Sequence, residues 1–157
     1  RPLNESSHDW GVFLQALEEV CFELAMMIVH DGEGADKFVT VNVTGALSDE
    51  DADFAARSVA NSLLNKTAWA GTYPNWGRIM DSIGYSRAKI QEESVEILYD
   101  NVQVVEGGMR TDVAQEALVA IVSQTDFSIN IHLHIGDGVA TVYTCNCTEE
   151  YVRINVE

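Results

Sequence analysis

Residues 30–38 read HDGEGADKF and decide the fold, because a helical pattern ends there and an alternating strand pattern begins. Gly32 and Gly34 lie on either side of Glu33, and glycine allows positive φ angles and a close approach by a ligand. Glu33 is therefore either held on a tight turn that points into a cleft, or part of a solvated acidic turn behind a glycine-terminated helix. The spacing alone favours the solvated turn, so the remaining sequence must decide between the two.

The segment before this turn, residues 9–30, predicts one amphipathic helix with Asp9 as its N-cap. Its apolar side chains recur at spacings of three and four: Phe13, Ala16, Leu17, Val20, Leu24, Met27 and Ile28. Phe22 and Met26 widen this stripe, so we expect the helix to be buried against a sheet in a layered α/β body.

The segment after the turn alternates helical and strand patterns. Its expected elements are a strand at 38–44, a helix from 48 to about 64 with Ser48 as N-cap, a hairpin of 95–99 and 102–105, a helix at 112–124 with Thr111 as N-cap, strands at 127–135 and 139–147, and a short helix at 148–155. This order predicts an α+β fold, with a helical portion of a layered domain at 1–37 and a compact mixed α/β domain at 38–157.

Residues 69–78 read WAGTYPNWGR and form an aromatic segment that we interpret as a loop. Two functions are consistent with it. The loop either lines a ligand site, with Asn75 and Arg78 supplying polar contacts, or docks on the core as a tryptophan-anchored structural plug.

Charge and composition exclude several classes of function. The net charge of −16, from 25 acidic residues against 9 Lys and Arg, argues against binding to a nucleic-acid backbone. No apolar run approaches the roughly twenty residues of a membrane span, and the start lacks the profile of a signal peptide. Cys21, Cys145 and Cys147 are expected to be reduced intracellular thiols.

A metal site is conceivable at His132 and His134, which share one face of a predicted strand. No nearby Cys or His spacing supplies further ligands, so we predict a solvent-facing pair and no metal.

Five sequence blocks resemble the ornithine acetyltransferase family, the glutamate N-acetyltransferases of arginine biosynthesis. The blocks are residues 31–38, 58–62, 66–68, 74–78 and 151–155, which read DGEGADKF, SVANS, KTA, PNWGR and YVRIN. They occur in the family's order over nearly the whole chain, which is more specific than any one block.

The resemblance implies an enzyme whose precursor cuts itself before a threonine into α and β chains that remain together. The new N-terminal threonine takes the acetyl group from N-acetylornithine and passes it to glutamate, with an oxyanion hole from the α chain. The sequence resembles only the later part of the β chain and lacks this threonine, so we expect it to be inactive alone, with residues 1–37 belonging to the nucleophile-bearing domain. The implied partners are the α chain and a second αβ unit in a heterotetramer.

The resemblance also implies no cofactor, with acetyl-CoA as a further acetyl donor if the enzyme is bifunctional. Its implied location is the cytoplasm, or the mitochondrial matrix in a fungus.

Two substrate contacts transfer from the family, Glu33 in the DGEG motif and Asn155 near the C-terminus. The carboxylate would attract amino groups of ornithine, and the amide would hydrogen-bond its α-carboxylate or α-amine. Asp36 stands where the family commonly has threonine, and Leu63 where proline is usual, but neither change removes a contact. The alternative to an enzyme is a non-catalytic acidic module that binds a small amino-acid ligand or regulates a partner.

Overall fold

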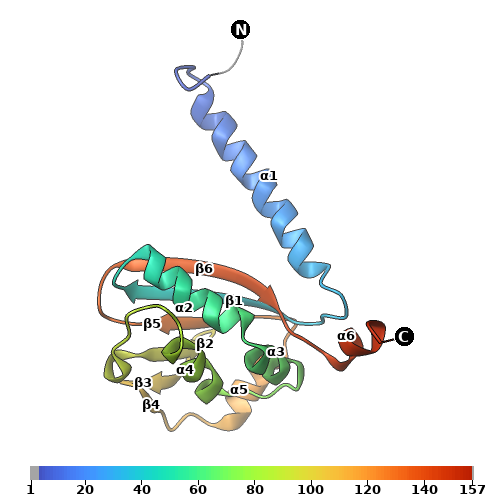
Figure 1. Ribbon diagram of the computed structural model, residues 1–157, viewed down its shortest axis with the longest axis vertical. Coiled ribbons are helices and arrows are strands. Elements are labelled where there is room, and N and C mark those ends of the chain that lie inside the picture. Colours follow the sequence, from blue (N-terminus) through green and yellow to red (C-terminus); the bar gives the residue numbers. More distant parts are fainter. Residues whose placement is uncertain (1–3, 157) are drawn as a thin grey trace.

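A computed structural model describes residues 4–156 and contains a six-stranded mixed sheet in the order β4-β3-β2-β5-β1-β6 (Figure 1). The strands are β1 Phe38–Ala46, β2 Glu96–Tyr99, β3 Val102–Glu106, β4 Met109–Arg110, β5 Asp126–His132 and β6 Gly138–Cys145. The helices are α1 Trp10–His30, α2 Asp49–Asn61, α3 Leu63–Ala70, α4 Trp76–Gly84, α5 Gln115–Val122 and α6 Glu149–Ile154, with a 3-10 turn at Glu92–Ser94. The predicted α+β class is confirmed.

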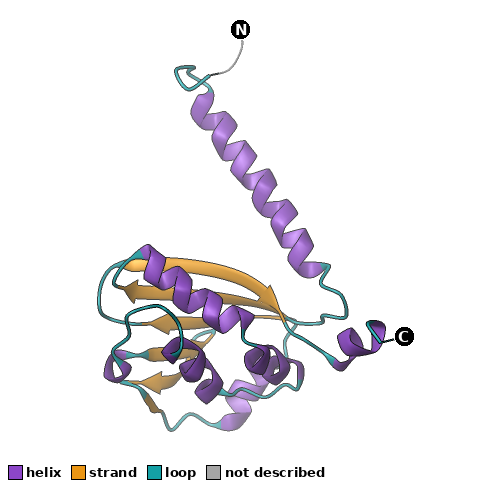
Figure 2. Ribbon diagram, in the orientation of Figure 1, coloured by secondary structure: helices purple, strands orange, loops and turns teal. Residues whose placement is uncertain are grey.

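Strand β1 lies inside the sheet next to the edge strand β6, and it pairs in parallel with β5 and antiparallel with β6. Its side chains alternate as the sequence predicts. Val39, Val41 and Val43 are buried in the same core cluster as the alanine-rich face of α2, which packs across β1 and β6 (Figure 2).

The opposite face of β1 is polar and carries a short ladder of amides and hydroxyls. Asn42 Nδ2 donates to Asn130 Oδ1 at 2.8 Å, and Thr141 Oγ1 donates to Asn42 Oδ1 at 2.8 Å. These bonds join β5, β1 and β6 across one face of the sheet, so the register of the three strands is fixed by side chains as well as by the backbone.

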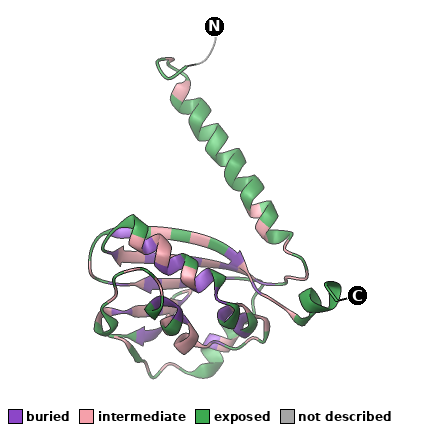
Figure 3. Ribbon diagram, viewed as in Figure 1, coloured by how far each residue is buried: buried purple, intermediate pink, exposed green. Residues whose placement is uncertain are grey.

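Helix α1 differs from the sequence-based prediction in its burial within residues 4–156. The helix forms over the predicted residues, but none of its residues is buried, and Figure 3 shows it exposed along most of its length. It touches the sheet only sparsely, for example where the Phe22 ring lies edge-on to Tyr143, with centroids 5.4 Å apart. Periodicity identifies an apolar face but not the surface that covers it, which is why the expected burial against a sheet does not follow. Asp9 precedes the helix without making a side-chain cap hydrogen bond.

The helix predicted from residue 48 to 64 is divided in two. Its start is as predicted, since the Ser48 hydroxyl accepts a hydrogen bond from the Asp51 N–H at 3.2 Å. The break is at Ser62, which has an extended backbone and whose hydroxyl caps α3 by accepting from the Asn65 N–H at 3.4 Å. A serine inside a helical pattern thus ends one helix and begins the next.

Other element boundaries also differ from the sequence-based expectation. Helix α5 begins at Gln115 instead of 112, because the Thr111 hydroxyl is not a cap and donates to the Gln103 carbonyl at 2.8 Å. The short strand β4 was not predicted. Strand β5 ends at His132, two residues before His134 takes a positive φ of 55°.

Candidate functional site

The two predicted site residues meet at one corner of the molecule. Glu33 lies in the turn between α1 and β1, and Asn155 is the C-cap of α6. Asn155 Nδ2 donates to Glu33 Oε2 at 2.6 Å and to the Tyr151 carbonyl at 2.8 Å. A contact therefore joins two exposed side chains that are 122 positions apart in the sequence.

The Thr148 hydroxyl connects the turn that carries Glu33 with the helix that carries Asn155. Its Oγ1 donates to the Gly34 carbonyl at 2.6 Å and accepts from the Tyr151 N–H at 3.3 Å, which caps α6. The Thr148 side chain thus bonds to both the turn and the helix, in addition to the Glu33–Asn155 hydrogen bond.

Gly34 is required at this junction for two reasons. Its φ is +67°, in the left-handed region that glycine tolerates. A Cβ atom there would also lie 2.7 Å from the backbone nitrogen of Tyr151, so the start of α6 can approach the turn only if residue 34 has no side chain.

Asn146 forms a second connection, just before α6. It is 4 % exposed, and its Oδ1 accepts from the N–H groups of Asp36 at 3.1 Å and Lys37 at 3.3 Å. Its Nδ2 donates to Asp36 Oδ1 at 2.6 Å. Asp36 therefore helps to fix the turn.

Lys37 anchors the beginning of β1 from inside the protein. Its Nζ donates to the Trp69 carbonyl at 2.8 Å and to Thr72 Oγ1 at 2.7 Å, and no carboxylate in the described chain lies within ion-pair distance. Burial lowers the pKa of Lys37, and the nearby Asp36 carboxylate opposes that shift. Thr72 has a positive φ of 53°, so this anchor holds an unusual backbone conformation at the end of α3.

The Glu33 carboxylate keeps one oxygen atom free to accept a hydrogen bond from a ligand. Within residues 4–156, Asn155 is its one hydrogen-bond partner, which engages Oε2 and leaves Oε1 free to accept from an ammonium group. A cation placed there would meet a carboxylate whose orientation is already set by an amide. The corner can therefore hold an amino group in a defined position.

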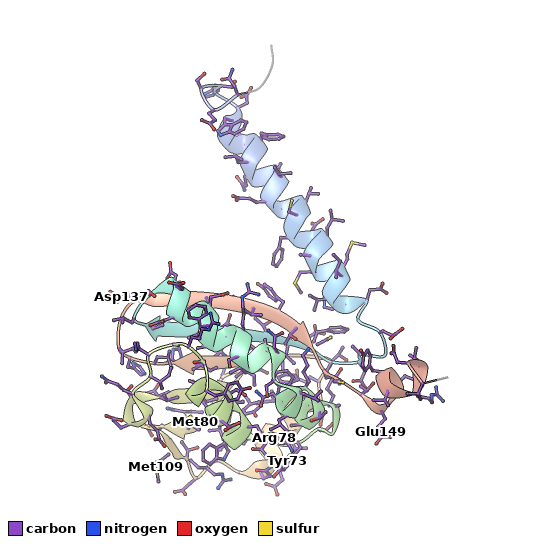
Figure 4. All side chains as sticks on the ribbon, viewed as in Figure 1. Tyr73, Arg78, Met80, Met109, Asp137 and Glu149 are labelled. Carbon is purple, nitrogen blue, oxygen red and sulfur yellow. The ribbon has the colours of Figure 1, made fainter. Side chains whose placement is uncertain are left out.

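The tryptophan-rich segment does not join this contact. Its two ends belong to α3 and α4, and residues 71–75 between them form a loop. Trp69 belongs to α3 and is 1 % exposed, while Trp76 begins α4. Asn75 caps α4 by accepting from the Arg78 N–H at 3.2 Å, and Arg78 Nη1 donates to the Leu64 carbonyl at 2.6 Å, which places Arg78 against α3 (Figure 4). The interpretation as a ligand-lining loop is not supported, because these polar groups stabilise α3 and α4.

The histidine pair contacts other side chains on the sheet. His132 Nδ1 lies 2.5 Å from Thr44 Oγ1, and the half-exposed His134 has its Nε2 3.3 Å from Glu96 Oε2. In the part of the chain with described coordinates, no group of three or more His, Cys, Asp or Glu side chains converges as metal ligands would. Within residues 4–156, Cys21, Cys145 and Cys147 are free thiols. No helix in this part of the chain is long and apolar enough to cross a membrane.

Sequence reasoning missed Asn146 and Thr148, the residues that hold the site together. Thr148, followed by Glu149 and Glu150, indicates on its own only the start of the short helix predicted at 148–155. Nothing in the local sequence indicates that the same hydroxyl reaches Gly34, which is 114 positions away.

Comparisons with known proteins bear on the family and the fold of this chain. The ArgJ family model matches residues 3–157. The arginine biosynthesis bifunctional protein ArgJ of Geobacter sulfurreducens is 46% identical over 156 residues, which are 99% of this chain and 40% of that protein. Its namesake in Bacillus cereus is 37% identical over 155 residues, which are 99% of this chain and 38% of that protein.

A solved structure shares the fold as well. The crystal structure of the arginine biosynthesis bifunctional protein from Bacillus halodurans superposes with a TM-score of 0.93 at 36% identity, covering 99% of this chain and 73% of the other. The chain spans about two fifths of the length of the curated relatives it matches. With a family model that matches almost from end to end, the chain belongs to the ArgJ family.

Proposed function

We propose that this chain is the later part of the β chain of a self-processing N-acetyltransferase. The enzyme would move an acetyl group from N-acetylornithine to glutamate in arginine biosynthesis. One observation carries the proposal: Glu33 and Asn155, the two residues that match the family's substrate contacts, are hydrogen-bonded to each other at 2.6 Å.

In the proposed binding mode, Glu33 orients the substrate through charge. Its free Oε1 accepts a hydrogen bond from an ammonium group of N-acetylornithine, which is a charge-assisted interaction. Asn155 Nδ2 is engaged by Glu33 and Tyr151, so its Oδ1 is the atom left for the substrate. Together the two side chains place an amino group without taking part in bond making.

The nucleophile of the proposed reaction is a threonine outside this chain. Its hydroxyl oxygen attacks the acetyl carbonyl carbon, the amide C–N bond breaks, and ornithine leaves after its nitrogen gains a proton. The amine of glutamate then attacks the acetyl-threonine ester and regenerates the hydroxyl. No cofactor enters these steps, and acetyl-CoA would serve as an additional donor if the enzyme is bifunctional.

The proposed partners are the α chain of the same precursor and a second αβ unit. Exposed apolar side chains on α1 support a partner, since Val12, Met27 and Ile28 are each more than half exposed. The bacterial biosynthetic relatives support a location in the cytoplasm.

The proposal is tested in the complete gene product by Glu33→Gln. This change removes the charge but keeps the shape, so KM for N-acetylornithine should rise about 10–100-fold, as expected for a lost hydrogen bond to a charged group. The matched control is Glu50→Gln, which removes an exposed carboxylate in the first turn of α2. Unchanged kinetics for Glu33→Gln would refute the substrate role.

A second experiment separates the enzyme from a non-catalytic binding module. Intact mass and N-terminal sequencing of the native product should find a threonine-led β chain that includes these residues and is bound to an α chain. A native chain that begins at Arg1, with no threonine-led segment attached, would support the binding module instead.

A further inference from the structure

We propose that a hollow between α2 and the loop after α4 binds a small organic phosphate that carries a planar base, the chemistry of a mononucleotide. The hollow is open to solvent and has a volume of about 430 Å³, which falls in the range of small-molecule sites. Its lining includes Phe54, Arg57, Ser58, Asn61, Tyr85 and Arg87. None of these residues takes part in the Glu33–Asn155 contact.

The first argument is charge. The chain has only 9 Lys and Arg among 157 residues, yet two arginines line this one hollow. Asp53 engages Arg57 through Nε, at 2.9 and 2.7 Å from its two carboxylate oxygens, which leaves both terminal nitrogens of that guanidinium for a ligand. Arg87 has no carboxylate within ion-pair distance in the described chain. Guanidinium groups are suited to phosphate because they donate two parallel hydrogen bonds.

The second argument is the aromatic surface beside these charges. Tyr85 is 59% exposed, and the Arg87 guanidinium lies 5.8 Å from the centre of the Phe54 ring. Exposed aromatic faces and arginine planes are the groups on which nucleobases stack. An inorganic phosphate would use the arginines but leave the aromatic part of the hollow empty.

The third argument concerns the free polar groups of the hollow and the net charge of the chain. Ser58 and the exposed Asn61 make no side-chain hydrogen bond within the described residues, so they are available to sugar hydroxyls. The net charge of −16 would repel the many phosphates of a nucleic-acid strand. A mononucleotide is small enough to contact only the two arginines of the hollow. The features together favour a single nucleotide over a polymer or a bare anion.

The test is calorimetric titration of ADP, adenosine and inorganic phosphate into the complete gene product. We expect saturable binding of ADP, with adenosine and phosphate each at least about tenfold weaker, because each lacks one half of the interaction. Arg87→Met and Tyr85→Ala should each weaken ADP binding about tenfold or more without changing the thermal midpoint, since both side chains are exposed.

The matched control is Arg110→Met on β4, which removes an equal charge away from the hollow and should leave ADP binding unchanged. The proposal is overturned if ADP does not bind saturably, if phosphate alone binds as tightly as ADP, or if Arg110→Met weakens ADP as much as Arg87→Met does. The result is independent of the acetyltransferase proposal, since Glu33→Gln leaves every residue of the hollow in place.

Discussion

Helices α1 and α2 flank β1 on either side in the sequence, and both have apolar faces, yet only α2 is buried. Alanines and Val59 allow α2 to lie close against the sheet, and five of its residues are buried. Helix α1 has larger apolar side chains and buries none within the described structure. The comparison teaches that apolar content does not determine burial, because a helix also needs a surface whose shape and polarity match its own.

The largest expected effect comes from placing a charge on each helix in turn. Val59→Asp puts an unpaired carboxylate in a fully buried position and should lower the free energy of unfolding by about 4 kcal/mol or more. Val20→Asp on α1, where the valine is 52% exposed, should change it by less than about 0.5 kcal/mol. Urea denaturation of the 157-residue chain measures both. Equal losses would show that α1 is as well packed as α2.

A glycine pair sharpens the same comparison at the junction between α1 and the sheet. Gly34→Ala forces a side chain into a positive φ and against Tyr151, and should cost about 1–3 kcal/mol. Gly11→Ala lies in α1 with no atom within 4 Å of the new Cβ, and should stabilise by about 0.5 kcal/mol. Thermal denaturation should show a lower midpoint for Gly34→Ala and a higher midpoint for Gly11→Ala. An unchanged midpoint for Gly34→Ala would mean that α6 does not pack on the turn.

A smaller effect is expected at Thr148. Thr148→Val removes the hydroxyl that joins the turn to α6, which should cost about 1–2 kcal/mol. In the complete gene product it should also raise KM for N-acetylornithine more than it lowers kcat, because it loosens the Glu33–Asn155 pair. Thr125→Val, at an exposed threonine, is the control. A loss of stability with unchanged KM would make Thr148 purely structural.

The smallest effect is a pH dependence at Lys37. Its pKa is lowered in the folded protein, so the unfolded chain binds more protons once the pH exceeds the folded pKa. The stability of the native protein relative to Lys37→Met should therefore rise with pH, from the folded pKa up to the ordinary lysine pKa of 10.5. Urea denaturation between pH 7 and 10.5 measures this difference, with Lys89→Met at an exposed position as the charge control. A flat difference would place the Lys37 ammonium in a well-solvated environment.

The sequence predicts best where a local pattern has a local cause. The alternation along β1, the Asp100–Asn101 hairpin and the caps at Ser48 and Thr148 are all as expected, since each depends on neighbouring residues. Glu33 and Asn155 were assigned by resemblance, and only the structure shows that they touch.

Contacts between residues far apart in the sequence could not be predicted. The buried ammonium of Lys37 reaches Trp69 and Thr72, and Asn146 reaches Asp36, through contacts with no signal in the local sequence. The loop expected in the aromatic segment is present at residues 71–75, but the segment's ends are helical, since Asn75 caps a helix that begins at Trp76.

The pairing of β1 has a consequence for how the protein is made. Both neighbours of this strand, β5 and β6, lie in the last third of the sequence, after residue 125. During synthesis, about 80 residues must follow β1 before β5 begins and one edge of β1 can form its hydrogen bonds, and closing so long a loop slows folding. A chain released before residue 126 would present both edges of β1 to other molecules, which favours aggregation.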